Sequence, residues 1–109
     1  MQHLERYVWV FSRGRTSGVF SSFRTAEAWI EQHQLSGLLT AYPLDEGVYD
    51  WAMRNHRFRP SKPHHGSPDQ VASFDSAYLA HVHYEDGQAQ AEREDALALS
   101  RRLGSQSST

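Results

Sequence analysis

Cysteine is absent from this 109-residue chain. Disulfide bonds, thiolate metal ligands and a cysteine nucleophile are therefore excluded. Long hydrophobic runs are also missing, because no window approaches the roughly 18 apolar residues needed to cross a bilayer. The apolar start of the chain is interrupted by Glu5 and Arg6 and is too short for a secretory signal. These absences lead us to expect a cytoplasmic protein without a membrane segment.

An excess of positive charge is missing as well. The formal net charge is -2 at pH 7, whereas nucleic-acid-binding domains are usually strongly basic. The chain has no glycine-rich phosphate loop, no nucleophile elbow and no HExxH motif, so recognised catalytic patterns are lacking too. We therefore expect a non-enzymatic protein without a cofactor, and we regard nucleic acid as the less favoured partner.

The residues that are present suffice for one modest core. Hydrophobic residues make up 39% of the chain and aromatic residues 12%, in a length close to the commonest domain size. Aromatic and β-branched residues over 7–12 predict a central strand, since both of its faces are apolar. A turn at Gly14 leads to a second strand over 17–21, and the short separation favours an antiparallel hairpin.

The middle of the chain predicts a helix followed by a strand. Ser22 is expected to cap a helix over 23–34 that Gly37 ends, and a third strand is expected over 38–42. Pro43 has no N–H for a strand ladder, so it should mark the strand's end.

The second half predicts two helices and a strand. Asp45 is expected to cap a helix over 45–55. The segment Ser67-Pro68-Asp69-Gln70 has the pattern of a capping box with proline at the first helical position, which predicts a helix over 68–74. Val71 and Phe74 should face inward there. Alternation over 78–84 predicts the last strand, ended by Glu85-Asp86-Gly87.

The expected fold is α+β, with an antiparallel sheet of about four strands in the chain order β-β-α-β-α-α-β. The 23–34 helix should cover one face, and the other two helices should close the open side or an edge. We expect residues 1–87 to form a single domain. Residues 88–103 should form a weakly packed helical extension, because the apolar stripe Ala96, Leu99 and Leu103 is thin. A disordered tail is expected over 104–109.

Several segments occur in a characteristic order: VWVF, SGVFSS, AEAWI, LSGLLTAYPLDEGVYDWA and HVHYEDG. In this order they resemble a family of small bacterial proteins classified only as a domain of unknown function. The resemblance covers residues 7–87, with 35–52 its most specific part, and it implies no catalytic residues. Small proteins of this kind often look like immunity or antitoxin partners of bacterial toxins, which is an argument by analogy.

Aromatic and acidic residues gather where the third strand passes into the next helix. Rings beside carboxylates suit an interface hot spot for a basic protein, such as a toxin domain. The same residues also suit an ordinary helix start with a packed tyrosine, and nothing in their spacing indicates catalysis. The candidate protein-binding residues are Tyr42, Asp45, Glu46, Tyr49 and Asp50.

Two alternatives stay open. Basic residues around Phe58, namely Arg54, Arg57, Arg59 and Lys62, could contact the phosphates of a nucleic acid while the ring stacks on a base. The second alternative is a metal-dependent enzyme. His81 and His83 share one strand face, and His64, His65 or a carboxylate such as Asp45 could complete a zinc site. No spacing matches a recognised zinc pattern, so histidines bonded to neighbours or water explain the pattern as well.

Overall fold

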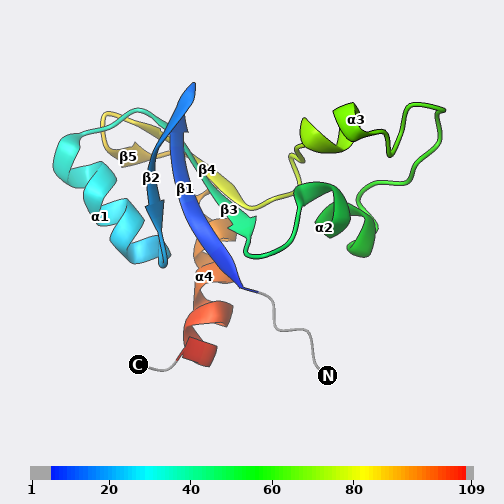
Figure 1. Cartoon of the computed structure of the whole chain (residues 1–109). Coiled ribbons are helices and arrows are strands. Elements are labelled where there is room, and N and C mark those ends of the chain that lie inside the picture. The colour runs from blue at the N-terminus through cyan, green and yellow to red at the C-terminus, as the bar shows by residue number, and fades with distance from the viewer. Residues whose placement is uncertain (1–5, 108–109) are drawn as a thin grey trace. The chain divides into compact units, whose positions relative to one another are not determined.

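The computed structural model describes the backbone of residues 6–107 and the side chains of residues 6–102. None of the helices in this range combines the length and apolar character that crossing a membrane requires. Figure 1 shows the elements along the chain. They are β1 (Tyr7–Arg13), β2 (Arg15–Phe20), α1 (Phe23–His33), β3 (Gly37–Pro43), α2 (Val48–Arg54), α3 (Pro68–Ala72), β4 (His81–Glu85), β5 (Gln88–Ala89) and α4 (Arg93–Ser107).

The chain divides into two compact units. Residues 1–44 and 79–109 form the first, which we call the sheet unit because it holds all the strands of the described residues together with α1 and α4. Residues 45–78 form the second, which we call the helical unit because it holds α2 and α3. The α+β class expected from the sequence is confirmed.

The sheet is antiparallel throughout, with the strand order β2-β1-β3-β4-β5. β1 lies inside the sheet, as its two apolar faces predicted. The sheet has five strands where about four were expected. The additional strand arises because Asp86 (φ 50°) and Gly87 (φ 80°) adopt left-handed backbone conformations, which make a tight two-residue hairpin turn between β4 and β5.

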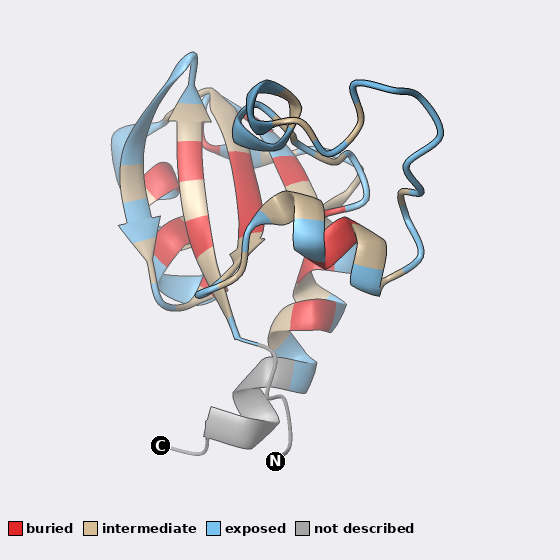
Figure 2. Cartoon of the chain, turned by 45° about the vertical axis from the view of Figure 1, so that its right-hand side comes forward, coloured by how far each residue is buried: buried red, intermediate tan, exposed pale blue. Residues whose placement is uncertain are grey.

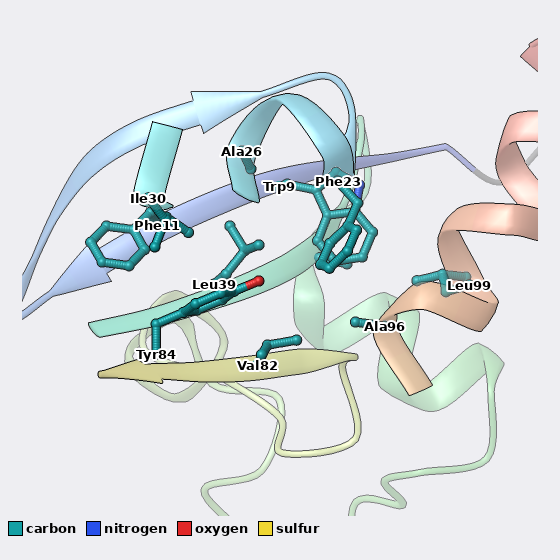
Figure 3. Close-up of a cluster of buried hydrophobic side chains, with 11 residues drawn as sticks. Trp9, Phe11, Phe23, Ala26, Ile30, Leu39, Val82, Tyr84, Ala96 and Leu99 are labelled. Atoms are coloured by element: carbon teal, nitrogen blue, oxygen red, sulfur yellow. The ribbon is translucent and has the colours of Figure 1, made fainter. Parts of the chain in front are cut away.

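One face of the sheet carries the main core. Alternate strand residues project onto this face, where α1 and α4 supply the opposing side chains (Figure 3). Figure 2 shows the buried residues as bands that alternate along the strands and recur on the helices. The core consists of Trp9, Phe11, Phe23, Ala26, Ile30, Leu39, Ala41, Val82, Tyr84, Ala96 and Leu99.

α1 begins as predicted, because the Ser22 hydroxyl accepts a hydrogen bond from the backbone N–H of Thr25 at 3.1 Å. Its end differs from the prediction. Gln34 ends the helix in a left-handed conformation (φ 53°), whereas Gly37 starts β3. A Cβ at Gly37 would lie 2.6 Å from the Phe11 ring and 2.7 Å from the carbonyl oxygen of Ser12. Glycine at 37 therefore permits close pairing of β1 and β3.

α4 is the largest departure from the sequence-based expectation. The helix begins at Arg93 and continues to Ser107, whereas a helix over 88–103 and a disordered tail over 104–109 were expected. Residues 108–109 lie outside the described residues. The expected weak packing is wrong, because Ala96 is fully buried and Leu99 is 8% exposed. A short alanine side chain lets the helix approach the core closely, so few apolar residues suffice to dock it. The side chain of Leu103, the third residue of the predicted stripe, lies outside the described residues.

A partly exposed ion pair holds the start of α4 against α1. Arg93 donates two hydrogen bonds to the carboxylate of Glu27, at 2.9 and 2.7 Å. The Tyr84 hydroxyl donates a third to the same carboxylate at 2.7 Å. The hydrogen bond from Arg93 lowers the pKa of Glu27. Burial, followed by the bond to Glu27, raises the pKa of Tyr84. Three elements therefore meet at one carboxylate.

The elements of the helical unit are shorter than the sequence predicted. α2 begins at Val48 with Gly47 as its N-cap, so the expectation that Asp45 caps a helix over 45–55 is wrong. Asp45 lies instead in a turn directly after β3 with φ 63°, a conformation that aspartate tolerates better than most residues.

α3 has the predicted N-cap, since Ser67 accepts a hydrogen bond from the N–H of Gln70 at 3.3 Å. The helix ends at Ala72, and Val71 is 39% exposed, so its predicted inward orientation is wrong. β4 likewise begins later than expected. The Ser76 hydroxyl accepts a hydrogen bond from the N–H of Tyr78 at 3.2 Å, which holds this segment in a turn.

Candidate functional site

The first candidate site lies on β4, on the sheet face opposite the main core. Residues two apart on a strand project to the same side, and His81 and His83 therefore stand side by side. Their ring centroids are 5.7 Å apart. β3 forms the neighbouring strand, with Thr40 opposite His81 and Leu38 opposite His83. The strand pairing thus fixes the spacing of the two imidazoles.

The β4–β5 hairpin brings a carboxylate to this pair. After the turn, the N–H of Gln90 donates to the carbonyl of His83 at 2.8 Å, which returns the chain alongside β4. Glu92 then accepts a hydrogen bond from the His83 imidazole Nδ1 at 2.6 Å and another from the His83 backbone N–H at 3.3 Å. The bond from the imidazole holds the pKa of Glu92 below its ordinary value.

Together, His81, His83 and Glu92 form a group able to hold a metal ion, with one potential ligand atom from each residue and all three atoms within 4.8 Å of one another. His81 Nδ1 lies 2.8 Å from the carbonyl oxygen of Leu79. A carbonyl can only accept, so Nδ1 carries the proton and Nε2 of the neutral ring is left as the ligand atom. Sequence reasoning selected the two histidines but missed Glu92, because the Asp-Gly hairpin signal was interpreted only as the end of a strand.

His64 and His65 belong to the helical unit, and the metal-capable group found in the described part of the chain does not include them. His65 organises its own loop. Its Nδ1 accepts hydrogen bonds from the backbone N–H groups of Ser61 at 2.9 Å and Lys62 at 3.1 Å. Desolvation, with smaller contributions from the His64 and Lys62 charges, lowers the pKa of His65. The neutral imidazole of His65 is therefore the form that accepts these two hydrogen bonds.

The candidate protein-binding residues have diverse surroundings. Tyr42 lies on β3 in the sheet unit, whereas the other four belong to the helical unit. Glu46 forms a bidentate ion pair with Arg54, with N–O distances of 2.8 and 3.0 Å, and its side chain is only 16% exposed. Asp45 and Asp50 are exposed. Two carboxylates of the predicted patch are therefore directed to solvent, and the third is engaged within its own unit.

Tyr49 belongs to a cluster of aromatic rings inside the helical unit. Its ring centroid lies 5.7 Å from that of Phe58 and 5.4 Å from that of Phe74. Phe58 and Phe74 are 4.9 Å apart, and His65 packs against Phe58 at 5.1 Å. Tilted and edge-to-face contacts of this kind stabilise by roughly 0.5–1.5 kcal/mol each beyond the area that they bury. This aromatic cluster joins α2, the following loop and the segment after α3.

The basic residues of the helical unit are also divided. Arg54 pairs with Glu46, and the Arg57 guanidinium lies 4.6 Å above the ring centroid of Tyr78. Tyr78 is 62% exposed and Arg57 is exposed too. Arg59 and Lys62 are exposed in the loop. The Arg57–Tyr78 stack is an accessible aromatic and cationic feature that the sequence pattern did not indicate, since the two residues lie far apart along the chain.

These features define a small α+β protein in which a separate helical unit interrupts the sequence between two neighbouring strands of an antiparallel sheet. The chain belongs to the family described as a domain of unknown function (DUF7710), whose model matches residues 8–90. The comparison with curated proteins found no match, and the comparison with solved structures found none either. The expected membership in an uncharacterised family is confirmed. The matched range includes His81 and His83 and ends before Glu92.

Proposed function

We propose that the protein is a non-enzymatic protein-binding module whose recognition surface lies on the helical unit, residues 45–78. β3 and β4 are antiparallel neighbours, and two residues suffice to connect such strands. The chain instead places residues 44–80 between them. The loops that join such strands in hairpins are commonly only about 2–5 residues long. This connection contains two helices, of which α3 is capped by the Ser67 side chain, and an aromatic cluster. A folded insertion of this length favours a functional role.

The exposed Arg57–Tyr78 stack is the observation on which the proposal depends. Tyrosine and arginine are enriched among the residues that dominate binding energy at protein interfaces. Tyr78 is 62% exposed, with the guanidinium already held 4.6 Å above its ring. A ring that is ordered before binding loses little side-chain entropy on association. The stack therefore has the composition and the order that suit an interface anchor.

The charges of the helical unit favour a protein over a nucleic acid. Acidic residues slightly outnumber basic ones between 45 and 78, and Glu46 neutralises Arg54 through a bidentate pair. The exposed carboxylates Asp45 and Asp50 suit a partner with a basic surface, because complementary charge accelerates association. We propose a basic toxin domain as this partner, which gives the protein an immunity or antitoxin-like role.

Affinity capture with quantitative mass spectrometry tests the proposal. The wild type and the control Arg15→Ala, which removes an exposed charge from β2 in the sheet unit, should retain one protein in stoichiometric amount. Tyr78→Ala should capture at least about tenfold less of this protein than the wild type, because truncation of an interface hot spot costs about 2 kcal/mol or more of binding free energy. Asp45→Lys/Asp50→Lys should slow association with the purified partner. Equal capture by all variants, or no stoichiometric protein, would contradict the proposal.

Single-stranded nucleic acid is the second candidate partner, and the same stack favours it. Exposed rings beside arginine can stack on bases, with nearby Arg59 and Lys62 contacting phosphates. Such binding would weaken steeply with salt. Retardation of a labelled oligonucleotide at low salt, lost in Tyr78→Ala, would support this candidate; absence of retardation at low salt would eliminate it.

A further inference from the structure

We propose that His81, His83 and Glu92 form a binding site for a Zn²⁺ ion with three protein ligands and one open position. The site lies entirely in the sheet unit. It is therefore independent of the protein-binding role proposed for residues 45–78.

The spacing of the three groups suits a zinc ion. Zinc binds imidazole nitrogen and carboxylate oxygen at about 2.0–2.2 Å in tetrahedral geometry, which places two ligand atoms about 3.4 Å apart. The three ligand atoms here are all within 4.8 Å of one another. His83 Nδ1 and the Glu92 carboxylate, which are 2.6 Å apart and joined by a hydrogen bond, would separate as zinc replaces the shared proton. Small rotations of these side chains would bring all three to coordination distance without a change in strand pairing.

The chemistry of the donors selects the class of metal. Two imidazoles and one carboxylate suit zinc and its transition-metal neighbours, whereas magnesium and calcium prefer sites made of oxygen ligands. The hydrogen bond between His81 Nδ1 and the Leu79 carbonyl fixes the ring orientation and leaves Nε2 for the metal. Histidines that bind metals are regularly held in this way by a second partner.

Exposure leaves room for an ion to enter and for a fourth ligand. The side chain of His83 is 57% exposed and that of Glu92 is 34% exposed. Structural zinc sites usually have four protein ligands, whereas sites with three keep a position for water or another ligand. An ion bound here would also join β4 to the segment that leads into α4. Zinc should therefore raise the thermal stability of the sheet unit as well as bind to it.

A purely structural role explains the same contacts without a metal. Glu92 accepts hydrogen bonds from both the backbone N–H and the imidazole of His83. It thereby gives a partner to a backbone N–H of β4 that the short strand β5 does not reach. The experiment must distinguish this role from metal binding, since either would make Glu92 important for folding.

Equilibrium dialysis of the untagged, metal-free full chain against Zn²⁺ alone, followed by elemental analysis, tests the site. The wild type should bind a single zinc ion. His81→Ala and Glu92→Gln should each weaken zinc binding by at least about tenfold, the lower range seen when even outer-shell partners are removed. His56→Asn is the matched control. It removes an exposed imidazole elsewhere, and asparagine tolerates the positive φ of 58° at that position.

NMR of the wild-type imidazole nitrogens keeps the test independent of how well the variants fold. Zinc should shift the resonances of His81 and His83 and leave those of His56 and His64 unchanged. The proposal is overturned if the wild type binds no zinc, if Glu92→Gln binds zinc like the wild type, or if the zinc-induced shifts fall on histidines of the helical unit. Loss of stability in Glu92→Gln with no zinc bound by the wild type would leave only the structural role.

Discussion

The sheet unit and the helical unit are stabilised in different ways. In the sheet unit, buried apolar residues from three strands and two helices share one core. In the helical unit, α2 contributes the buried Trp51 and Ala52, whereas α3 has no buried residue. Ring contacts around Phe58, the Glu46–Arg54 pair and hydrogen bonds from side chains to the backbone hold its loops. This contrast supports the proposal that the first unit is a scaffold and the second carries the recognition surface, since binding residues concentrate on loops.

Removing a core side chain should produce the largest difference between the units. Ile30 is completely buried in α1, whereas Val71 is 39% exposed in α3. Ile30→Ala should lower the free energy of unfolding by about 2–5 kcal/mol, because it leaves a cavity in a packed core. Val71→Ala should change it by about 0.5 kcal/mol or less. Urea denaturation followed by tryptophan fluorescence measures the free energy of unfolding of both variants. Similar losses in the two variants would contradict the difference in packing between the two units.

Cutting the ion pair that holds α4 should have an intermediate effect. Arg93→Ala removes both hydrogen bonds to Glu27, and these groups are partly exposed at 38% and 22%. We expect a loss of about 1–2 kcal/mol after allowance for solvent screening, with faster amide exchange at Ala96 and Leu99. Arg101→Ala changes an exposed residue of the same helix and should leave the exchange rates unaltered. Unchanged exchange in Arg93→Ala would show that apolar packing alone docks α4.

Truncation within the aromatic cluster should affect the helical unit locally. Phe58→Ala removes contacts to Tyr49, Phe74 and His65. Because Phe58 is only partly buried, we expect a cost of about 1–2 kcal/mol. Limited proteolysis should then cut the 57–66 loop several times faster, with cleavage of the sheet unit unchanged. Cleavage that accelerates equally in both units would contradict a local role of the aromatic cluster in the helical unit.

The smallest and most selective effect should come from pH. The pKa of His65 is lowered from 6.5 in the folded chain, so the unfolded state binds the proton more readily. The stabilisation is therefore complete above pH 6.5 and is lost as pH falls through the folded pKa. Protonated Nδ1 can no longer accept from Ser61 and Lys62. Exchange of these two amides, corrected for intrinsic rates, should increase between pH 7.5 and 5.

The sheet unit provides the contrast for this pH experiment. The pKa of Glu27 is lowered from 4.5, mainly by its hydrogen bond from Arg93. Its stabilisation is complete above pH 4.5 and is lost only as pH falls through the lower folded pKa. Amides at the start of α4 should therefore keep their protection down to about pH 5. Loss of protection in both units over the same pH range would contradict the assignment of one transition to His65 and the other to Glu27.

Patterns that arise from burial could be predicted from the sequence, and the sheet unit is rich in them. Apolar residues on both faces of 7–12 marked β1 as an interior strand, and Ser22 marked the start of α1 correctly. The packing of α4 depended on contacts across the chain, such as Arg93 with Glu27, which no local window contains. β5 follows from the local Asp86-Gly87 turn, but this signal was interpreted only as the end of a strand. The position of Asp45 was misjudged because a residue suited to a helix cap is equally suited to a turn.

The candidate sites were predicted less completely for the same reason. His81 and His83 could be selected from their spacing of two along a strand. Their partner Glu92 reaches them only through the Asp86–Gly87 turn, which determines the path of the chain after β4. The stack of Arg57 on Tyr78 likewise depends on how the loops of the helical unit close. Side chains that meet through a turn become visible only once the conformation of the turn is known.

Hydrogen exchange of the full chain with and without its captured protein partner would test the assignment of scaffold and recognition surface most directly. Slower exchange should be confined to residues 45–78, with the largest change around Arg57 and Tyr78, while β1 and β3 exchange as in the free chain. Slower exchange on the sheet unit, with residues 45–78 unaffected by the partner, would contradict the assignment.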